Sequence, residues 1–284
     1  ADPSTFALFN CLGTPIVEAA LPLVKDTGIP FFAPFTGASS ARKSGFTNVL
    51  NIRSGYVDET EQLVRHLTTI NLQRIAIVTQ NNAFGNEILT SSKAALEKRK
   101  TVAVALAKVE NSGVGAQEAV TAILAGNPQA VIVGLAGKPT IEFIKRMRAA
   151  NKGLALYALS VMGSSATIQA LGADAVGVTL TQVVPLPSNA SLPLVRDFQA
   201  AWTESKTNLQ LSHLALEGYI SARIFAEALK RAGPNPTRAG FIKSTWAMRN
   251  YDLGGYIVSF DDPSSNASKF VELTMIASGG RFVR

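Results

Sequence analysis

One stretch near the N-terminus, residues 6–38, most restricts what this chain can fold into. It contains an apolar run at 6–9, a Gly-Thr break, an amphipathic segment, and a second apolar run at 29–34. Short, continuously apolar runs bounded by turn residues are typical of parallel strands that helices cover on both faces. The stretch therefore predicts a strand, a loop, a helix, a second strand and a second loop.

The two loops follow the carboxyl ends of these strands. Thr14 is placed to cap the helix that follows the first loop, and Pro15 suits its first position. The second loop contains Phe-Thr-Gly-Ala at residues 35–38. Neighbouring parallel strands bring such loops side by side, where backbone N–H groups, hydroxyls and helix N-termini favour an anion. We therefore expect the two loops to bind a carboxylate.

Strands and helices alternate again further along the chain. Apolar runs at residues 74–79, 101–109, 130–134 and 155–159 are separated by helical patterns at residues 85–99, 117–124 and 140–150. This alternation predicts a second doubly wound parallel sheet. A further strand is expected at 176–184, and a long helix at 211–232.

The composition excludes several classes of site. The single cysteine, Cys11, cannot form an internal disulfide, and it suits a small buried residue better than a reactive thiol. The two histidines lack the spacing of a paired metal site. There is no GxSxG elbow, Walker A loop or plausible Ser-His-Asp set. We expect no catalytic residue, no metal and no cofactor.

The net charge of +7 comes from Lys and Arg residues scattered along helical patterns. Solvated helix faces explain such a distribution, and no concentrated basic stripe predicts nucleic-acid binding. No apolar run is as long as a membrane span, and no signal-peptide pattern is present, as in a secreted protein whose leader has been removed.

Several phrases, in order along the chain, resemble one family. They are LGTP, IPFFAPFTGAS, NIRSGYVDETEQLVRHL, QRIAIVTQNNAFGNE and ALEGYISARIFAEALKRAG. They are similar to the periplasmic solute-binding proteins of branched-chain amino acid type ABC transporters, which are type I periplasmic binding proteins. Members usually begin with a further strand-helix-strand-helix unit, of about 50 to 80 residues by ordinary element lengths. We expect either that unit or a neighbouring molecule to cover the edge of the strand at 6–9.

The resemblance implies an α/β fold with two doubly wound parallel-sheet lobes and three chain crossings between them. The N-lobe is expected at residues 1–55 plus 186–258, and the C-lobe at residues 56–185 plus 259–284. Lobes connected in this way are expected to bend about a hinge and close on a ligand.

The resemblance also implies which residues contact the ligand. The N-lobe loops would contribute Cys11, Leu12, Gly13, Thr14, Phe35, Thr36, Gly37 and Ala38. The C-lobe would contribute Phe84, Ala136 and Ser160, and Tyr56 would lie at the first crossing. Two alternatives stay open at this point: Thr14 as a plain helix cap, and Tyr56 as a packed hinge aromatic.

Two positions depart from the pattern of amino-acid binders. Such proteins usually have an acidic residue near Ser160, which holds the ligand ammonium, and an aromatic residue near Ala136. An unpaired ammonium in a closed site is costly. Unless Glu217 or Asp58 reaches the site, we expect a carboxylic acid without an amine. An aromatic acid would suit Phe35, Phe84 and Tyr56.

The leading functional hypothesis is a periplasmic, monomeric binding protein, without enzyme activity, that delivers a small carboxylate-bearing ligand to a membrane ABC permease. A ligand-sensing domain of a receptor or regulator with the same fold is the alternative. An α/β enzyme is a third possibility, which the missing motifs disfavour. A turnover assay beside a binding titration distinguishes these classes.

Overall fold

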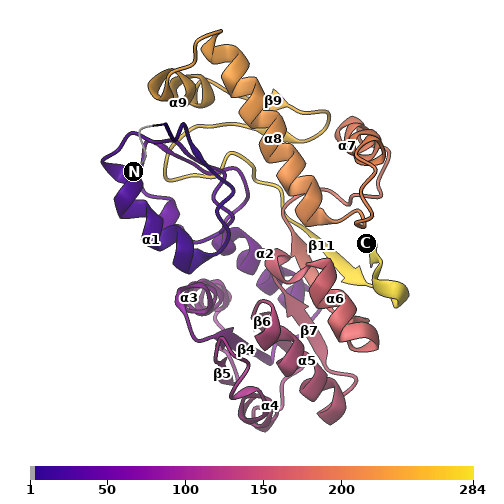
Figure 1. Ribbon diagram of the computed structural model, residues 1–284. Helices are drawn as coiled ribbons and strands as arrows, with labels where there is room; N and C mark the ends of the chain where they lie inside the picture. The colour runs from indigo at the N-terminus through magenta and orange to yellow at the C-terminus, as the bar shows by residue number, and fades with distance from the viewer. Residues whose placement is uncertain (1–3) are drawn as a thin grey trace. The chain divides into compact units, whose positions relative to one another are not determined.

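The computed structural model describes residues 4–284, which form two compact units (Figure 1). Unit 1 comprises the residues up to Gly55 together with Val183–Phe270. Unit 2 comprises Tyr56–Gln182 together with Val271–Arg284. The chain therefore passes from one unit to the other three times.

The third passage comes later than the sequence predicts. The segment 259–270, expected in the second lobe, belongs to unit 1. Its backbone is bonded there, because Ala267 N–H donates to Asn51 O and Ser268 N–H donates to Ile52 O.

Unit 1 contains a three-stranded parallel sheet in the order β1-β2-β3. Its strands are β1 (Leu8–Phe9), β2 (Phe31–Phe32) and β3 (Val49–Leu50). The first two are shorter than their apolar runs: β1 ends at Phe9 as predicted but begins two residues later, and β2 ends early because Ala33 adopts a left-handed conformation. Asn10 and Ala33 have φ of 50° and 49°. These residues end β1 and β2 and turn the chain into the loops that follow.

Helices cover both faces of this small sheet. On one face α1 (Thr14–Lys25) packs apolar side chains against Phe31 and Val49. On the other, Phe32 and Leu50 lie in a core shared with three helices. These are α7 (Pro193–Glu204), α8 (His213–Ala232) and α9 (Arg238–Trp246), and the antiparallel pair β9 (Tyr251–Asp252) and β10 (Ile257–Val258) adjoins them.

The sheet of unit 1 has β1 at one edge. Four apolar side chains in β1, in the loop that follows it and in α1 are exposed. They are Phe9, Leu12, Ile16 and Leu23.

Unit 2 contains a seven-stranded sheet in the order β12-β11-β8-β7-β6-β4-β5. Its strands are β4 (Ile75–Gln80), β5 (Leu106–Val109), β6 (Ala130–Gly134), β7 (Ala155–Ala158), β8 (Thr179–Gln182), β11 (Glu272–Ile276) and β12 (Phe282–Val283). The five from β4 to β8 are parallel, whereas β11 and β12 run antiparallel to their neighbours.

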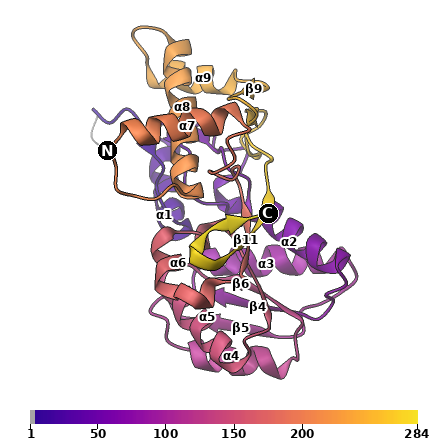
Figure 2. The same ribbon diagram turned by 90° about the vertical axis from the view of Figure 1, so that its right-hand side faces the viewer.

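Two layers of helices bury this sheet (Figure 2). One layer consists of α2 (Tyr56–Thr69) and α3 (Ala83–Glu97), and the other of α4 (Ala116–Ala125), α5 (Lys138–Ala150) and α6 (Ser165–Leu171). The central strands β4 and β6 are accordingly apolar on both faces, as parallel strands between helices should be. Within residues 4–284, no helix has the length and apolar character that crossing a membrane requires.

Gly85 allows α3 to begin close to the end of β4. A Cβ at this position would lie 1.8 Å from Gln80 O and 2.6 Å from Gln80 N. Backbone atoms cannot move aside cheaply, so we expect Gly85→Ala to lower the free energy of unfolding by at least about 2 kcal/mol. Gly218→Ala in α8 is the control, since nothing lies within 4 Å of its added methyl. The control should raise stability by about 0.5 to 1 kcal/mol. Urea unfolding measures the stability of both variants, and an unchanged free energy of unfolding for Gly85→Ala would contradict the prediction.

His213 makes the stability of unit 1 depend on pH. Burial lowers the pKa of His213 to about 3, whereas an unfolded histidine titrates near 6.5. The unfolded chain therefore binds the additional proton between these values, so this contribution is complete above about pH 6.5 and falls as the pH drops toward 3. We expect a loss of about 2 kcal/mol between pH 7.5 and pH 5 from this group alone.

The measurement is urea unfolding at pH 7.5 and pH 5, for the protein and for His213→Gln, which cannot titrate. The variant should lose less stability on acidification than the unaltered protein. Equal losses for both proteins would show that His213 is not the titrating group.

Candidate functional site

The two loops at the carboxyl ends of β1 and β2 lie side by side in unit 1, as the sequence predicts. Leu12 and Phe35 form a parallel bridge. Gly13 N–H donates to Phe35 O at 3.1 Å, and Phe35 N–H donates to Cys11 O at 2.8 Å. The loops therefore continue the parallel pairing past the points where the two strands end.

Thr14 and Thr36 join these loops through their hydroxyls. Their Oγ1 atoms are 2.7 Å apart, and Ala38 N–H donates to Thr36 Oγ1 at 3.1 Å. Thr14 does not cap α1, since the cap is Gly13 and no side chain bonds to it. The alternative of Thr14 as a plain cap is therefore wrong.

Counting hydrogens shows what this hydroxyl pair can still do. Each threonine has one O–H hydrogen, and the bond between the two hydroxyls uses only one of them. The pair therefore keeps one O–H hydrogen for a further acceptor. Both side chains are buried, with 1% of Thr14 and 0% of Thr36 exposed, so such an acceptor would be held in a site with little water.

The other predicted residues of these loops differ in accessibility. Leu12 is 63% exposed, while Gly37 and Ala38 are buried. Cys11 is half-buried, and burial raises the pKa of its thiol. A thiol with a raised pKa stays protonated at neutral pH and is a poor nucleophile.

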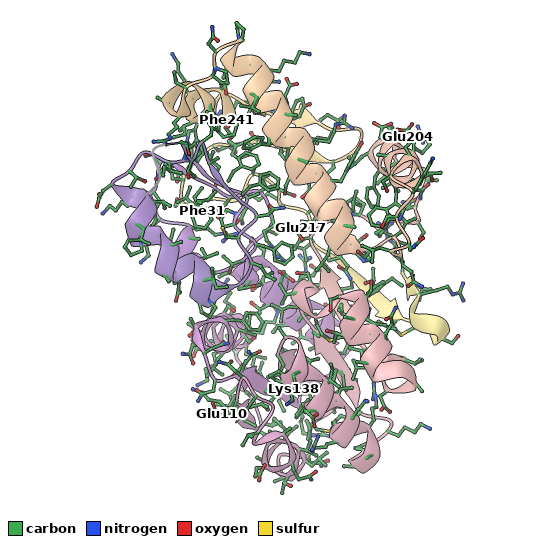
Figure 3. The ribbon with its side chains drawn as sticks, viewed as in Figure 1. Phe31, Glu110, Lys138, Glu204, Glu217 and Phe241 are labelled. Carbon is green, nitrogen blue, oxygen red and sulfur yellow. The ribbon has the colours of Figure 1, made fainter. Side chains whose placement is uncertain are left out.

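A buried ion pair lies beneath Phe35. The Arg53 side chain is 3% exposed, and its Nη1 is 3.5 Å from Glu217 Oε1 on α8, which is labelled in Figure 3. The guanidinium carbon lies 4.7 Å from the centre of the Phe35 ring, a cation–π contact. Glu217 therefore neutralises Arg53 within unit 1, rather than acting as the isolated carboxylate that the sequence raised as a partner for a ligand ammonium.

The cavity next to this pair is small. Its lining includes Pro34, Arg53, Glu217 and Tyr256, and its volume of about 10 Å³ suits a single water molecule. A solute the size of an amino acid does not fit there.

In unit 2, Tyr56 and Phe84 pack against each other. Their ring centroids are 5.3 Å apart in an edge-to-face arrangement, and both residues are buried. Tyr56 opens α2, and Phe84 lies in the first turn of α3 after the Asn82 cap. The packed-aromatic alternative for Tyr56 thus describes a contact that is present, and a ligand contact by either ring stays a prediction.

The loop after β6 is held by a side chain from β4. Ala136 N–H donates to Gln80 Oε1 at 3.1 Å, and Ala136 is partly exposed. The strand-end loops that contain Phe84 and Ala136 are thus both anchored to the carboxyl end of β4.

Ser160, at the start of a 3-10 turn (Ser160–Met162) after β7, bonds to a residue that sequence reasoning missed. Its N–H donates to Glu59 Oε2 at 2.9 Å, and its hydroxyl donates to Glu59 Oε1 at 3.1 Å. Glu59 is 0% exposed. A signal existed, because Glu59 lies three residues after Tyr56 and four before Leu63, on the buried face of α2.

These residues provide no evident metal centre. Across the described part of the chain, residues 4–284, no three His, Cys, Asp or Glu side chains are grouped so as to hold a metal ion. The residues at the carboxyl ends of the strands, in each unit, are hydrogen-bonding and aromatic groups. Such groups suit an organic solute better than a metal.

The buried ion pair leads to a prediction about stability. Glu217→Gln removes the carboxylate that lies 3.5 Å from Arg53 Nη1, and removing one partner of a buried pair typically costs about 3 to 5 kcal/mol. Glu227→Gln on the same helix is the control, because its pair with Arg231 is partly exposed and should contribute less than about 1 kcal/mol. Urea unfolding compares the two. Similar small losses in both variants would contradict the role given to Arg53 and Glu217.

Comparisons with known proteins agree with this geometry. The sequence matches the family described as periplasmic binding protein over residues 2–281. No curated protein matches the chain. A substrate-binding periplasmic protein from Ralstonia solanacearum is 30% identical, with a TM-score of 0.87, over 98% of this chain and 80% of that one.

Two further solved structures are informative. A possible leucine/isoleucine/valine-binding protein from Rhodopirellula baltica SH 1 is 29% identical, with a TM-score of 0.91, over 98% of this chain and 77% of that one. A fatty acid ABC transporter substrate-binding protein from Thermomonospora curvata is 17% identical and shares the fold, with a TM-score of 0.80, over 96% of this chain and 72% of that one. These matches confirm the predicted α/β fold of type I periplasmic binding proteins. Since the family match spans nearly the whole sequence, the chain belongs to the periplasmic binding protein family.

Proposed function

We propose that this protein works outside the cytoplasm, in the periplasm, as a monomer that captures a small carboxylate-bearing solute and delivers it to a membrane ABC permease. The solute is an amino acid or an organic acid, including aromatic acids. Loops from both units contribute contacts, and the protein performs no chemistry on what it binds. Membership of the periplasmic binding protein family supports this class of function. The names of two similar proteins refer to leucine/isoleucine/valine binding in one and to fatty acid ABC transport in the other.

The observation that supports a carboxylate-bearing ligand is the hydroxyl pair of Thr14 and Thr36. It retains one O–H hydrogen in a buried position, beside the N-terminus of α1. A carboxylate oxygen is a strong acceptor for such a donor, and the helix N-terminus favours its negative charge. Predicted contacts from Cys11, Leu12, Gly13, Phe35, Gly37 and Ala38 would surround it.

Capture by two units connected three times implies a bending motion. A solute would first meet the loops of one unit, and closure would then add Tyr56, Phe84, Ala136 and Ser160 from the other. A micromolar ligand supplies about 8 kcal/mol, which is enough to shift an open-closed equilibrium whose states differ by a few kcal/mol. The permease would recognise the closed form.

A thermal-shift screen over amino acids, hydroxy acids and aromatic acids tests the proposal. A ligand present at 100 times its dissociation constant stabilises the protein by about 2.7 kcal/mol, which such a screen detects. Binding without turnover would support a transport protein. Consumption of a stabilising compound would instead indicate an enzyme.

Thr36→Val tests the site itself, because it keeps the shape and deletes the hydroxyl. We expect the affinity for the carboxylate ligand found in the screen to fall by about 1 to 3 kcal/mol. Thr27→Val is the control, since that hydroxyl bonds only within the turn after α1. Calorimetric titration should show weaker binding for Thr36→Val alone. An unchanged titration curve would remove Thr36 from the site.

A further inference from the structure

A chain of side-chain amides joins the loops that follow three strands of unit 2. Gln80, the last residue of β4, accepts from Ala136 N–H through its Oε1 at 3.1 Å. Its Nε2 donates to Asn111 Oδ1 at 2.8 Å, and Asn82 Nδ2 donates to the same oxygen at 2.9 Å. Asn82 also caps α3, since its Oδ1 accepts from Gly85 N–H at 3.0 Å. The amides therefore connect the loop after β6 to the start of α3.

Both ends of this chain are backbone N–H groups, and they fix the direction of every bond in it. A backbone N–H can only donate, so the side-chain oxygens of Gln80 and Asn82 face those two groups. The NH₂ groups of both side chains then face Asn111, whose oxygen accepts from each. Asn111 thus acts in this chain as an acceptor, a role that an aspartate can also fill.

The backbone just before Asn111 is bonded to the loop after β4. Asn81 N–H donates to Val109 O at 2.9 Å, and Asn81 Nδ2 donates to Glu110 Oε1 at 2.7 Å. The Asn111 side chain is exposed. Because its backbone is held by these bonds, that side chain is nevertheless presented at a defined place, within reach of both amides.

The chain of amides lies where the strand order of unit 2 reverses. β4 and β6 are neighbours in the sheet, yet the helices that follow them, α3 and α5, belong to opposite layers (Figure 2). In open α/β sheets, ligands bind outside the carboxyl ends of the strands at such a switch point. Phe84 follows β4 and Ala136 follows β6, so these two predicted ligand contacts lie on the two sides of it.

We infer that Gln80 and Asn111 are positioning residues of the proposed ligand site, which hold Ala136 at a set place relative to Phe84. The inference rests on the proposed function. Gln80 holds Ala136 directly, whereas Asn111 acts through Gln80 and Asn82. A ligand that contacts both loops binds more tightly for this reason, because the loops need no ordering when it arrives.

Gln129 provides a matched control at the opposite end of β4. Its Oε1 accepts from Gln73 N–H at 3.0 Å and from Arg74 N–H at 2.9 Å, just before the strand begins. Gln80→Met and Gln129→Met each remove a side-chain oxygen that holds backbone N–H groups, so both should lower the free energy of unfolding. Only Gln80→Met should also change the loop after β6.

Amide hydrogen exchange followed by NMR, without any solute, tests the positioning. Ala136 N–H should be protected in the unaltered protein and should exchange at least about 10-fold faster in Gln80→Met. Asn111→Leu should accelerate the exchange by at least about 3-fold, whereas Asn111→Asp, which keeps the acceptor, should leave it unchanged, as should Gln129→Met. Unchanged protection in Gln80→Met, or equal effects of the two Asn111 variants, would overturn the inference.

Calorimetric titration with leucine, phenylalanine and benzoate measures the consequence for binding. For any of these that binds, the dissociation constant should rise at least about 10-fold in Gln80→Met and about 3-fold in Asn111→Leu. It should stay the same in Asn111→Asp and Gln129→Met, although Gln129→Met is also less stable. Unchanged affinity in Gln80→Met and Asn111→Leu would overturn the inference, since a merely structural role would affect both glutamine variants alike.

Two further outcomes are decided separately. If Gln80→Met does not fold, the Asn111 pair decides, because that exposed side chain can be replaced without disturbing the core. If neither these three solutes nor the thermal-shift screen yields a ligand, the proposed function fails. The exchange of Ala136 in the four variants then decides by itself whether Gln80 and Asn111 position the loop.

Discussion

The desolvated charge of Arg53 is the constraint on which unit 1 depends. A guanidinium that is 3% exposed requires a partner, and Glu217 from α8 supplies it. Because Arg53 follows β3 closely, this pair joins the end of the sheet to the longest helix of the unit. The Phe35 ring then covers the guanidinium. The loop that holds Thr36 is therefore positioned by a buried charge rather than by strand pairing alone.

Unit 2 also buries a charged side chain, but one of the opposite sign. The buried Glu59 carboxylate accepts from the Ser160 and Thr181 hydroxyls and from Ser160 N–H. The hydroxyl pair of unit 1 keeps one hydrogen to donate, whereas both polar hydrogens of Ser160 in unit 2 are donated to Glu59.

Sequence patterns predicted the buried parallel strands well, because β4 and β6 are covered on both faces and read as continuous apolar runs. They overestimated β2, since the left-handed conformation of Ala33, which ends it, leaves no distinctive residue type such as glycine. The side-by-side loops followed from strand order. The role of Glu59 did not, because its partners Ser160 and Thr181 are about a hundred or more residues away, and no local pattern shows such a contact.

The hydrogen bonds near the three passages limit where bending could occur. In unit 1, the Ser54 hydroxyl donates to Phe270 O at 2.9 Å, and the Tyr256 hydroxyl donates to Val183 O at 3.1 Å. In unit 2, Gln182 Nε2 donates to Thr274 Oγ1 at 3.1 Å. These bonds tie the chain down close to most of the points where it leaves a unit. The proposed closure would therefore bend the few peptide units between these anchors. A solute captured in this way would meet groups that are already held in place, so less of its binding energy would be lost in ordering them.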